Sequence, residues 1–371
     1  MSGTTGAGPR ISLYEHAVRL HEQHPDRPLP NEGRPFPGEP RAKRHSGQGG
    51  RRRVGADVAK ALDRHFAGDD PPQALAEAVR DLDVPIFRND RMTAAARRAD
   101  RERVRETGRW LVRHGPDQPA VALGLALLAT GRDEDDIPLI RTIGLLSNSF
   151  GWLAADALKR RRGGAEALVW LGDRVAGWGR VYVVEALCLV GGTEERDWLL
   201  RRSCDGDFLN SYFAARVATA AHLHEAITTW SDDDFVDHTG LLLARIAGAE
   251  GMGGTLDHYP HAHAVLDAYA DHLGRQAPSA GRYTRAAVIA HHLRASEIGT
   301  AERRARSVDR YRAVLDRDEW CAVVRAFVDD PDQDDDLRWF EEAFAAPLGL
   351  RAFATGAQSP RPARERDDRK D

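Results

Sequence analysis

The hexapeptide GWGRVY, residues 177–182, combines side chains that can bind ligands and partners. Trp178 lies between two glycines, where both its ring and the neighbouring backbone could meet a ligand. Arg180 follows two residues later, and a guanidinium group paired with an acid such as Asp173 or Glu185 can perform acid–base chemistry. One hypothesis is therefore an enzyme of unknown class whose site lies near Trp178 and Arg180.

Sequence motifs of the common enzyme classes are missing. The chain contains neither a G-x-S-x-G nucleophile elbow nor a phosphate-binding loop of the G-x-x-x-x-G-K-[ST] type. Its cysteines, Cys188, Cys204 and Cys321, are widely spaced and form no C-x-x-C pair, which favours reduced thiols over zinc or redox chemistry. We therefore expect no cofactor and favour a protein that is not an enzyme.

His258, His261 and His263 lie close together in the segment DHYPHAHAV and are the candidates for metal ligands. On a helix, His261 and His263 would point about 200° apart, whereas zinc ligands on one helix prefer the i, i+4 spacing. Histidine is also plentiful, with 15 copies in the chain. We therefore predict no metal site.

The stretch SNS at 147–149 precedes two aromatic residues and allows three interpretations: a catalytic loop, a recognition loop or a turn between helices. Polar or glycine-containing stretches at 176–179 and 205–207 have the same place between other expected helices. Serine and asparagine side chains in such turns accept hydrogen bonds from the free N–H groups of the next helix. The turn is the interpretation that we favour.

Aromatic, arginine and asparagine side chains recur in the middle of the chain and could line one edge of the fold. Trp, Tyr and Arg dominate the energetic hot spots of protein interfaces. The alternative for Trp152 and Tyr212 is burial in a core, because both lie among apolar residues at helical spacing. The predicted partner-binding residues are Asn148, Trp152, Trp178, Arg180, Asn210 and Tyr212.

Helical patterns dominate from Gly55 onward and strict alternation of apolar and polar residues is rare, so the predicted fold class is all-α. A short amphipathic helix is expected over 11–23 and an arginine-rich helix over 93–115. Residues 24–55 are rich in Pro, Gly, Arg and Ser, which predicts a disordered basic arm. The expected divisions are 1–55 for the short helix and arm, 56–115 for N-terminal helices, 116–251 for repeats, 252–350 for capping helices and 351–371 for a charged disordered tail.

The middle of the chain has an internal periodicity of about 30 residues. A shift by that length aligns Trp152, Tyr182, Tyr212 and Leu242. Each is followed by a second apolar residue, namely Leu153, Val183, Phe213 and Leu243. Two short helices cannot cover their own apolar stripe, so neighbouring units are expected to stack and share a core.

In the segment DGDFLNSYFAARVATAAHL, residues 205–223, an acidic turn precedes an aromatic pair, Arg216 and a run of small residues. With this segment as its best example, the region 116–251 resembles HEAT-like and armadillo-type α-solenoids, particularly the short-repeat variety of bacterial proteins. The resemblance implies stacked helical hairpins with a continuous binding surface. It also implies a non-enzymatic scaffold that binds a macromolecular partner, expected to be a protein, through one face of the middle repeats.

The charge balance argues against a dedicated nucleic-acid binder, because the chain has a formal charge of −4 and a pI near 6.4. Nucleic-acid binding is nevertheless the alternative function, since the HEAT-like arrays that resemble AlkD-type DNA glycosylases cradle duplexes in a basic groove. The basic arm at 41–53 and the helix that carries Arg97 to Arg113 would then supply the phosphate contacts.

The expected compartment is the cytoplasm, with no membrane partner. The longest apolar run, at 120–129, is well below the about 20 residues that a membrane-spanning helix requires. The N-terminus lacks the continuous apolar stretch of a secretory signal. Abundant Ala and Arg with few Lys and Met are typical of proteins from GC-rich bacteria.

Overall fold

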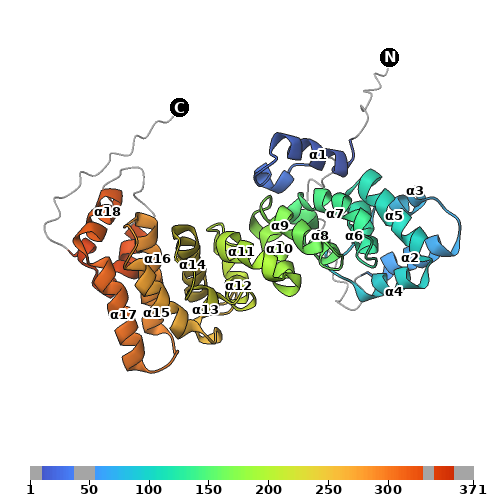
Figure 1. The fold of residues 1–371 in the computed structure, drawn as a ribbon. Helices are drawn as coiled ribbons and strands as arrows, with labels where there is room; N and C mark the ends of the chain where they lie inside the picture. Colours follow the sequence, from blue (N-terminus) through green and yellow to red (C-terminus); the bar gives the residue numbers. More distant parts are fainter. Residues whose placement is uncertain (1–10, 37–54, 329–337, 355–371) are drawn as a thin grey trace, which may run out of the picture. The chain divides into compact units, whose positions relative to one another are not determined.

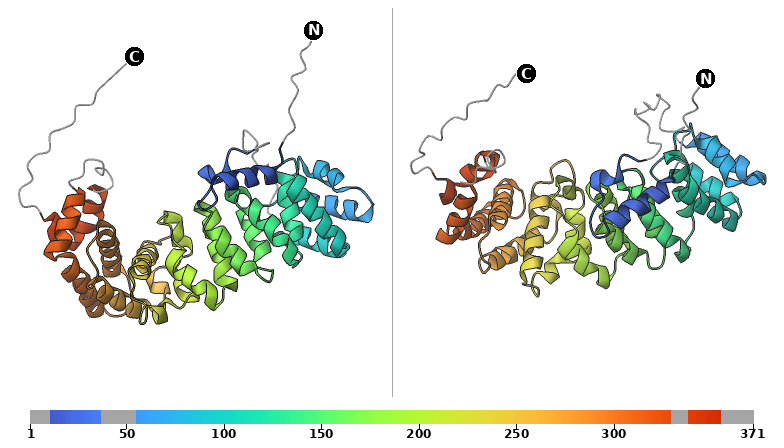
Figure 2. Two further views of the ribbon diagram at one scale, coloured as in Figure 1. Left: turned by 45° about the horizontal axis from the view of Figure 1, so that its top comes forward. Right: turned by 90° about the horizontal axis from the view of Figure 1, so that it is seen from above.

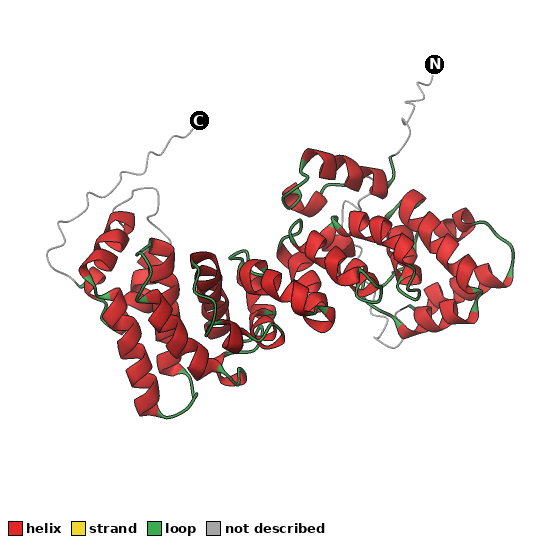
Figure 3. Cartoon of the chain, in the orientation of Figure 1, coloured by secondary structure: helices red, strands yellow, loops and turns green. Residues whose placement is uncertain are grey.

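The computed structural model describes residues 11–36, 55–328 and 338–354. Every regular element in these ranges is a helix, so the all-α prediction is confirmed for the described part of the chain (Figure 3). None of the helices there has the length and apolar character needed to cross a bilayer. The predicted basic arm at 41–53 and most of the predicted tail, 355–371, lie outside the described residues.

The chain divides into two compact units, which are described separately (Figure 1). Unit 1 comprises Met1–Leu223 with Gly251–Gly254, and unit 2 comprises His224–Glu250 with Thr255–Asp371. The helices of unit 1 are α1 (Leu13–Gln23), η1 (Pro30–Gly33), α2 (Ala56–Ala67), α3 (Pro72–Val79), α4 (Asp90–Arg98), α5 (Arg101–His114), α6 (Gln118–Leu128), η2 (Glu134–Asp136), α7 (Ile137–Gly144), α8 (Ser147–Leu158), α9 (Gly164–Gly172), α10 (Gly177–Val190), α11 (Thr193–Arg202), η3 (Phe208–Tyr212) and α12 (Ala214–Ala220).

Consecutive helices of unit 1 pack as pairs: α5 with α6, α7 with α8, α9 with α10, and α11 with α12. Each pair also packs on the next, because α6, α8, α10 and α12 form one row of neighbours while α5, α7, α9 and α11 form a second. Both views in Figure 2 show α6, α8 and α10 side by side. The apolar side chains that this packing buries form the core of unit 1.

The residues aligned by the 30-residue shift occupy two kinds of environment in unit 1. The second residues of the pairs, Leu153, Val183 and Phe213, are at most 1% exposed. The first residues, Trp152, Tyr182 and Tyr212, are only partly buried. Because successive residues of a helix point about 100° apart, a helix that buries one residue brings its predecessor to the edge of the core.

The arginine-rich helix expected over 93–115 is in fact two helices, α4 and α5, which are separated at Ala99 and Asp100. The carboxylate of Asp100 accepts a hydrogen bond from the N–H of Arg103 (2.9 Å) and so caps the start of α5. The prediction missed this break because the helical spacing of apolar residues runs through both helices.

Residues 24–36 differ from the predicted disordered arm, because they pack on the rest of unit 1. Leu29 and Phe36 are each 5% exposed, and the ring of Phe36 lies 6.4 Å from that of Phe150 in α8. Arg174 donates a hydrogen bond from Nε to the carbonyl oxygen of Pro25 (2.7 Å). A few apolar anchors are thus sufficient to order this part of a segment whose average composition predicts disorder.

The helices of unit 2 are also paired, and ion pairs join them. Arg282 of α16 contacts Asp237 (2.7 Å) and Asp233 (3.0 Å) of α14, and Arg310 of α17 contacts Asp267 and Asp271 of α15. The elements of unit 2 are α14 (Asp233–Ala247), η4 (Leu256–His258), α15 (Ala262–Leu273), α16 (Ala280–Ala295), α17 (Ala301–Leu315), α18 (Asp318–Val328), η6 (Glu341–Ala345), α20 (Ala346–Leu348) and η7 (Arg351–Phe353). The short helix α13 (Leu223–Ala226) begins at Leu223, which belongs to unit 1.

We predict that replacement of Gly124→Ala destabilises unit 1. A Cβ atom at Gly124 would lie 2.8 Å from the Cβ of Leu111 and 2.9 Å from the carbonyl oxygen of Gly108, so α5 and α6 would have to separate. Such overpacking costs about 1–3 kcal/mol, more than the gain in helix propensity. Thermal unfolding followed by circular dichroism measures the loss. Gly131→Ala is the control, since the nearest atom there is 3.7 Å away, and equal stability of the two variants would contradict the prediction.

We predict that the packing of α1 on unit 1 weakens as the pH falls below about 6.5. Burial, with a smaller effect of Arg174 and Arg141, lowers the pKa of His21 from its ordinary value of 6.5. His21 therefore binds a proton more readily when α1 is detached than when α1 is packed. The contribution of neutral His21 to the packing of α1 is present above pH 6.5 and is lost on acidification. Hydrogen exchange of the α1 amides, corrected for the intrinsic effect of pH, measures the loss. His21→Phe retains an aromatic contact with Trp170 and should make the protection independent of pH in this range.

Candidate functional site

Five aromatic side chains of unit 1 contact one another in a continuous series, which we call the aromatic row. The ring of Phe87 lies 5.3 Å from that of Trp152 and 6.3 Å from that of Tyr182. The ring of Trp178 lies 5.9 Å from that of Tyr182 and 4.9 Å from that of Tyr212. Centroid separations of this size are typical of interacting aromatic pairs.

The row draws its members from separate elements. Trp152 lies in α8, Trp178 and Tyr182 lie one turn apart in α10, and Tyr212 ends η3, while Phe87 comes from the loop before α4. Phe87 is 48% exposed and Trp178 is 38% exposed, so the row presents apolar surface to solvent. Large exposed aromatic groups are uncommon on a folded domain and mark candidate interaction sites.

Close packing of α8 on α10 brings these side chains together. A Cβ atom at Gly179 would lie 2.3 Å from the Cβ of Ser147, and one at Gly151 would lie 3.3 Å from the Cα of Gly179. Gly179, which follows Trp178, therefore allows the two helices to approach. The space beside this glycine is occupied by α8.

The stretch 147–149 is not the turn that we predicted. These residues form the first turn of α8, and only Leu145 and Leu146 separate α8 from α7. Ser147 is 1% exposed and Ser149 is 5% exposed, and no side-chain hydrogen bond caps the helix. The small side chain of Ser147 suits the close contact with Gly179 of α10. Asn148, the predicted binding residue in this stretch, is partly buried.

Arg180 is a structural residue of the interior and does not line the surface. Its side chain is 8% exposed, and its guanidinium group donates hydrogen bonds to the carbonyl oxygens of Gly172, Val175, Arg202 and Ser203. Burial lowers the pKa of Arg180 from its ordinary value, against the attraction of Asp205. The guanidinium group thus connects the ends of α9 and α11 and leaves little capacity for a ligand.

Asn210 is likewise interior, with 1% exposure. Its Oδ1 accepts hydrogen bonds from the N–H groups of Asp205 (3.0 Å) and Gly206 (3.1 Å), which fixes the loop before η3. Among the six predicted binding residues, the structure therefore brings Trp152, Trp178 and Tyr212 into one surface. Arg180 and Asn210 instead hold the scaffold beneath it.

The acids proposed for catalysis have other partners. Asp173 accepts a hydrogen bond from Nε1 of Trp198 (2.8 Å), and Glu185 forms an ion pair with Arg216 (3.0 Å). Burial raises the pKa of the Cys188 thiol to about 12, which makes it a poor nucleophile at neutral pH. No convergent acid–base pair is found near Trp178 in the described part of unit 1.

Glu32 lies beside the Trp178 end of the aromatic row. Its Oε1 would lie 2.4 Å from a Cβ atom at Gly177, the first residue of α10, and its backbone has the left-handed φ of 57°. Burial raises the pKa of Glu32, and the nearby Asp207 raises it further against the opposing effect of Arg34. The sequence offered no signal for this residue, because the segment that carries it resembles a linker.

A small pocket with arginine side chains on its rim lies beside the other end of the aromatic row. It is lined by Arg88, Arg97, Arg160 and Asp156, together with residues of α4 and α6, and we call it the basic pocket. Burial opposes ionisation of Asp156, but hydrogen bonds from Lys159 and Arg160 hold its pKa below the ordinary value. The position of Asp156, four residues after Trp152, was a signal that the two share one face of α8.

Most of the arginines predicted to contact phosphates are already paired. Arg98 pairs with Asp63 (2.7 Å), and Arg103 donates hydrogen bonds to the carbonyl oxygens of residues 65 and 66. Arg105 and Arg109 both contact the buried Asp136, and the guanidinium group of Arg113 lies over the ring of Tyr14. Within the described residues, Arg97 and Arg101 are the members of the set with neither an acidic partner nor one of these carbonyl or ring contacts.

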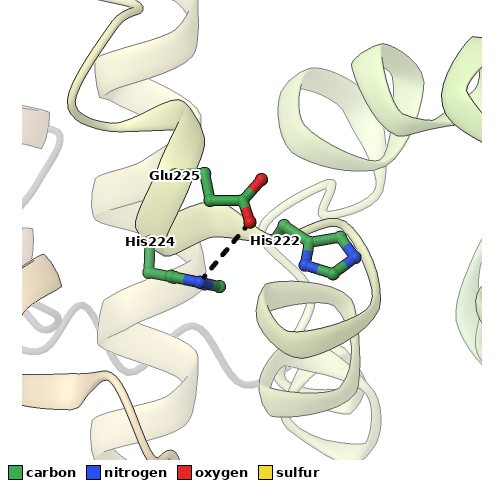
Figure 4. Close-up of side chains that lie close together, drawn as sticks. All are labelled: His222, His224 and Glu225. Carbon is green, nitrogen blue, oxygen red and sulfur yellow. Dashed lines mark ion pairs between the residues drawn. The ribbon is translucent and has the colours of Figure 1, made fainter.

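The histidines considered as metal ligands do not converge. In unit 2, His258 contacts the hydroxyl of Thr255 (2.9 Å), whereas the ring of His261 stacks on that of His224 at 3.6 Å. His224 also lies 3.8 Å from a carboxylate oxygen of Glu225 (Figure 4). His222, drawn in the same view, belongs to unit 1.

Comparison of the chain with protein-family models, curated proteins and solved structures gives no significant match. The candidate site is therefore defined by its own geometry: an exposed aromatic row with the Glu32 carboxylate beside Gly177, next to Trp178, and a basic pocket near Trp152.

We predict that Arg180→Met destabilises unit 1 by about 2–4 kcal/mol, because several buried carbonyl groups lose a charged donor. Arg202→Met is the matched control: the Arg202 side chain is 65% exposed and lies 3.7 Å from Asp173, so its loss should cost less than about 1 kcal/mol. Urea unfolding followed by circular dichroism measures both. A stability equal to wild type in Arg180→Met would show that this arginine is free for another task.

Proposed function

We propose that this protein is a non-enzymatic, HEAT-like helical repeat protein that binds a protein partner through the aromatic row of unit 1. The observation that carries the proposal is the continuous ring contact from Trp152 through Phe87, Tyr182 and Trp178 to Tyr212, with apolar surface left open to solvent. Partly exposed Trp and Tyr side chains are the types most enriched in interface hot spots.

The packing of unit 1 supports the HEAT-like part of the proposal. Helices succeed one another as pairs, and the even-numbered helices from α6 to α12 lie in one row. The aromatic row extends across α8 and α10, two successive helices of this set, and onto η3. Stacked helical repeats bind partners in this way, along a surface to which each repeat contributes a strip.

A protein partner is favoured over nucleic acid by the charges around the row. Arginines that could follow a phosphate backbone are mostly paired with acids or carbonyl groups of unit 1. Glu32 lies beside Gly177, next to Trp178, where its carboxylate would repel phosphates. A nucleic-acid function resembling that of the AlkD-type glycosylases would need a basic groove along the whole row.

A protein partner is also favoured over an enzymatic function. Catalysis near Trp178 would need Arg180 to reach a substrate, yet its donors are taken by carbonyl groups. We place the protein in the cytoplasm, where Cys188, Cys204 and Cys321, which form no disulfide among the described residues, would remain reduced.

We predict that Trp178→Ala weakens partner binding by at least about 30-fold, the loss of about 2 kcal/mol that is typical of a hot-spot residue. Proteins that co-purify with the full chain from its native extract are quantified by mass spectrometry, and the affinity of the recovered partner is then measured directly.

Trp339→Ala is the matched control, because Trp339 is a more exposed tryptophan, at 62%, in unit 2. Partners retained by wild type and by the control but lost from Trp178→Ala would support the proposal. Equal recovery with all three proteins would contradict it. Binding of labelled duplex DNA that weakens steeply with salt, with no protein recovered, would favour the nucleic-acid alternative.

A further inference from the structure

We infer that the basic pocket is the subsite for a single anionic side chain, a carboxylate or a phosphate group, from an acidic segment of the protein partner. The inference rests on the proposed function and names the chemistry of the segment that binds there. It follows from three features of unit 1: the continuity of pocket and row, the charge left free in the pocket, and the size of the pocket.

The pocket continues directly from the aromatic row. Phe87, whose ring contacts Trp152, is followed in the chain by Arg88 on the rim of the pocket. Trp152 is followed on the same face of α8, one turn later, by Asp156 in the pocket. A segment that covers the rings of Phe87 and Trp152 therefore has its next side chain at the entrance of the pocket.

The basic pocket has more arginine side chains than its one carboxylate, Asp156, can neutralise. Asp156, with 5% exposure, is paired with Lys159 (2.8 Å) and with Arg160 (3.2 Å). Arg88 and Arg97 are exposed on the rim and have no acidic partner among the described residues of unit 1. Two guanidinium groups that face one opening can donate charge-assisted hydrogen bonds to the same oxyanion.

The size of the pocket limits what can enter. Its volume is about 20 Å³, enough for one small functional group and far below the about 300 Å³ or more of a metabolite site. The anion must therefore be the end of a side chain whose main part lies outside, on the aromatic row.

The charge near Trp178 favours a protein segment over a nucleic acid as the partner. Glu32 lies beside Gly177, which precedes Trp178, so the row has a carboxylate near Trp178 and arginines near Trp152. An oligonucleotide carries a negative charge at every step and would meet that carboxylate. A peptide can place an acidic side chain at the pocket and neutral or basic residues beyond it, so the charges favour a protein segment.

The experiment uses the full chain labelled with 5-fluorotryptophan, whose ¹⁹F resonance for Trp152 is assigned with the variant Trp152→Phe. The chain is titrated with inorganic phosphate, and with sodium chloride at matched ionic strength. It is then titrated with short peptides that share one phenylalanine-containing sequence and differ at a single position, which is Asp, phosphoserine, Ser or Lys. A single-stranded oligothymidylate is the nucleic-acid probe.

We expect phosphate to shift the Trp152 resonance, with no effect on Trp339, and the acidic peptides to bind at least about tenfold more tightly than the serine peptide. The double variant Arg88→Gln/Arg97→Gln should lose both effects. The control Arg64→Gln/Arg101→Gln, which replaces two exposed arginines without acidic partners elsewhere in unit 1, should retain them. The Asp and phosphoserine peptides distinguish a carboxylate from a phosphate.

The inference is overturned if phosphate leaves Trp152 unchanged, or if the acidic preference survives in Arg88→Gln/Arg97→Gln. It is also overturned if the oligothymidylate binds more tightly than every peptide in an Arg88- and Arg97-dependent manner. Peptides that bind through Trp178 without any preference for charge would reject the anion subsite and leave the proposed function standing. If phosphate shifts the Trp152 resonance but Trp178→Ala leaves partner binding unchanged, the anion subsite stands and the proposed function is rejected.

Discussion

The close packing of α8 against α10 is the constraint on which the candidate site depends. Gly151 and Gly179 leave the two helices without bulky side chains at their contact, and Ser147 completes it. Each helix directs one apolar residue into the core, and the preceding residue, turned by about 100°, emerges at the edge. Because the helices are close, the side chains at this edge are near enough for Phe87 to bridge Trp152 and Tyr182. The row is thus a result of backbone packing more than of any attraction between its rings.

Internal ion pairs decide which charges of unit 1 are available to a partner. Asp136 is 1% exposed and is contacted by Arg105, Arg109 and Arg161, so these arginines neutralise a buried carboxylate. Arg161 also donates to the carbonyl oxygen of Leu128, which ties α6 to the end of α8. Counting charges along the sequence therefore overestimates the positive surface. In the basic pocket, Arg88 and Arg97 retain their charge, which suits recognition of one anionic group.

The sequence predicted the helical class because that class depends on local periodicity. It also identified three members of the aromatic row, Trp152, Trp178 and Tyr212. It could not place Arg180 and Asn210, because burial of a polar side chain depends on carbonyl and amide groups that only the folded chain brings near. Phe87 and Glu32 were missed for a related reason: Phe87 comes from a loop and Glu32 from the short helix η1, and both are distant in sequence from α10. A local sequence pattern does not state which distant segment will cover a given helix.

The bridging position of Phe87 has a consequence for divergence among related chains. Phe87 and Arg88 are neighbours in the loop that joins α3 to α4, yet one belongs to the row and the other to the pocket. Loops accept insertions and deletions more readily than the helices they join. A change of one residue in the length of this connection would displace the ring and the guanidinium group together. Selectivity for a partner could therefore evolve through a single loop while the helical framework stays as it is.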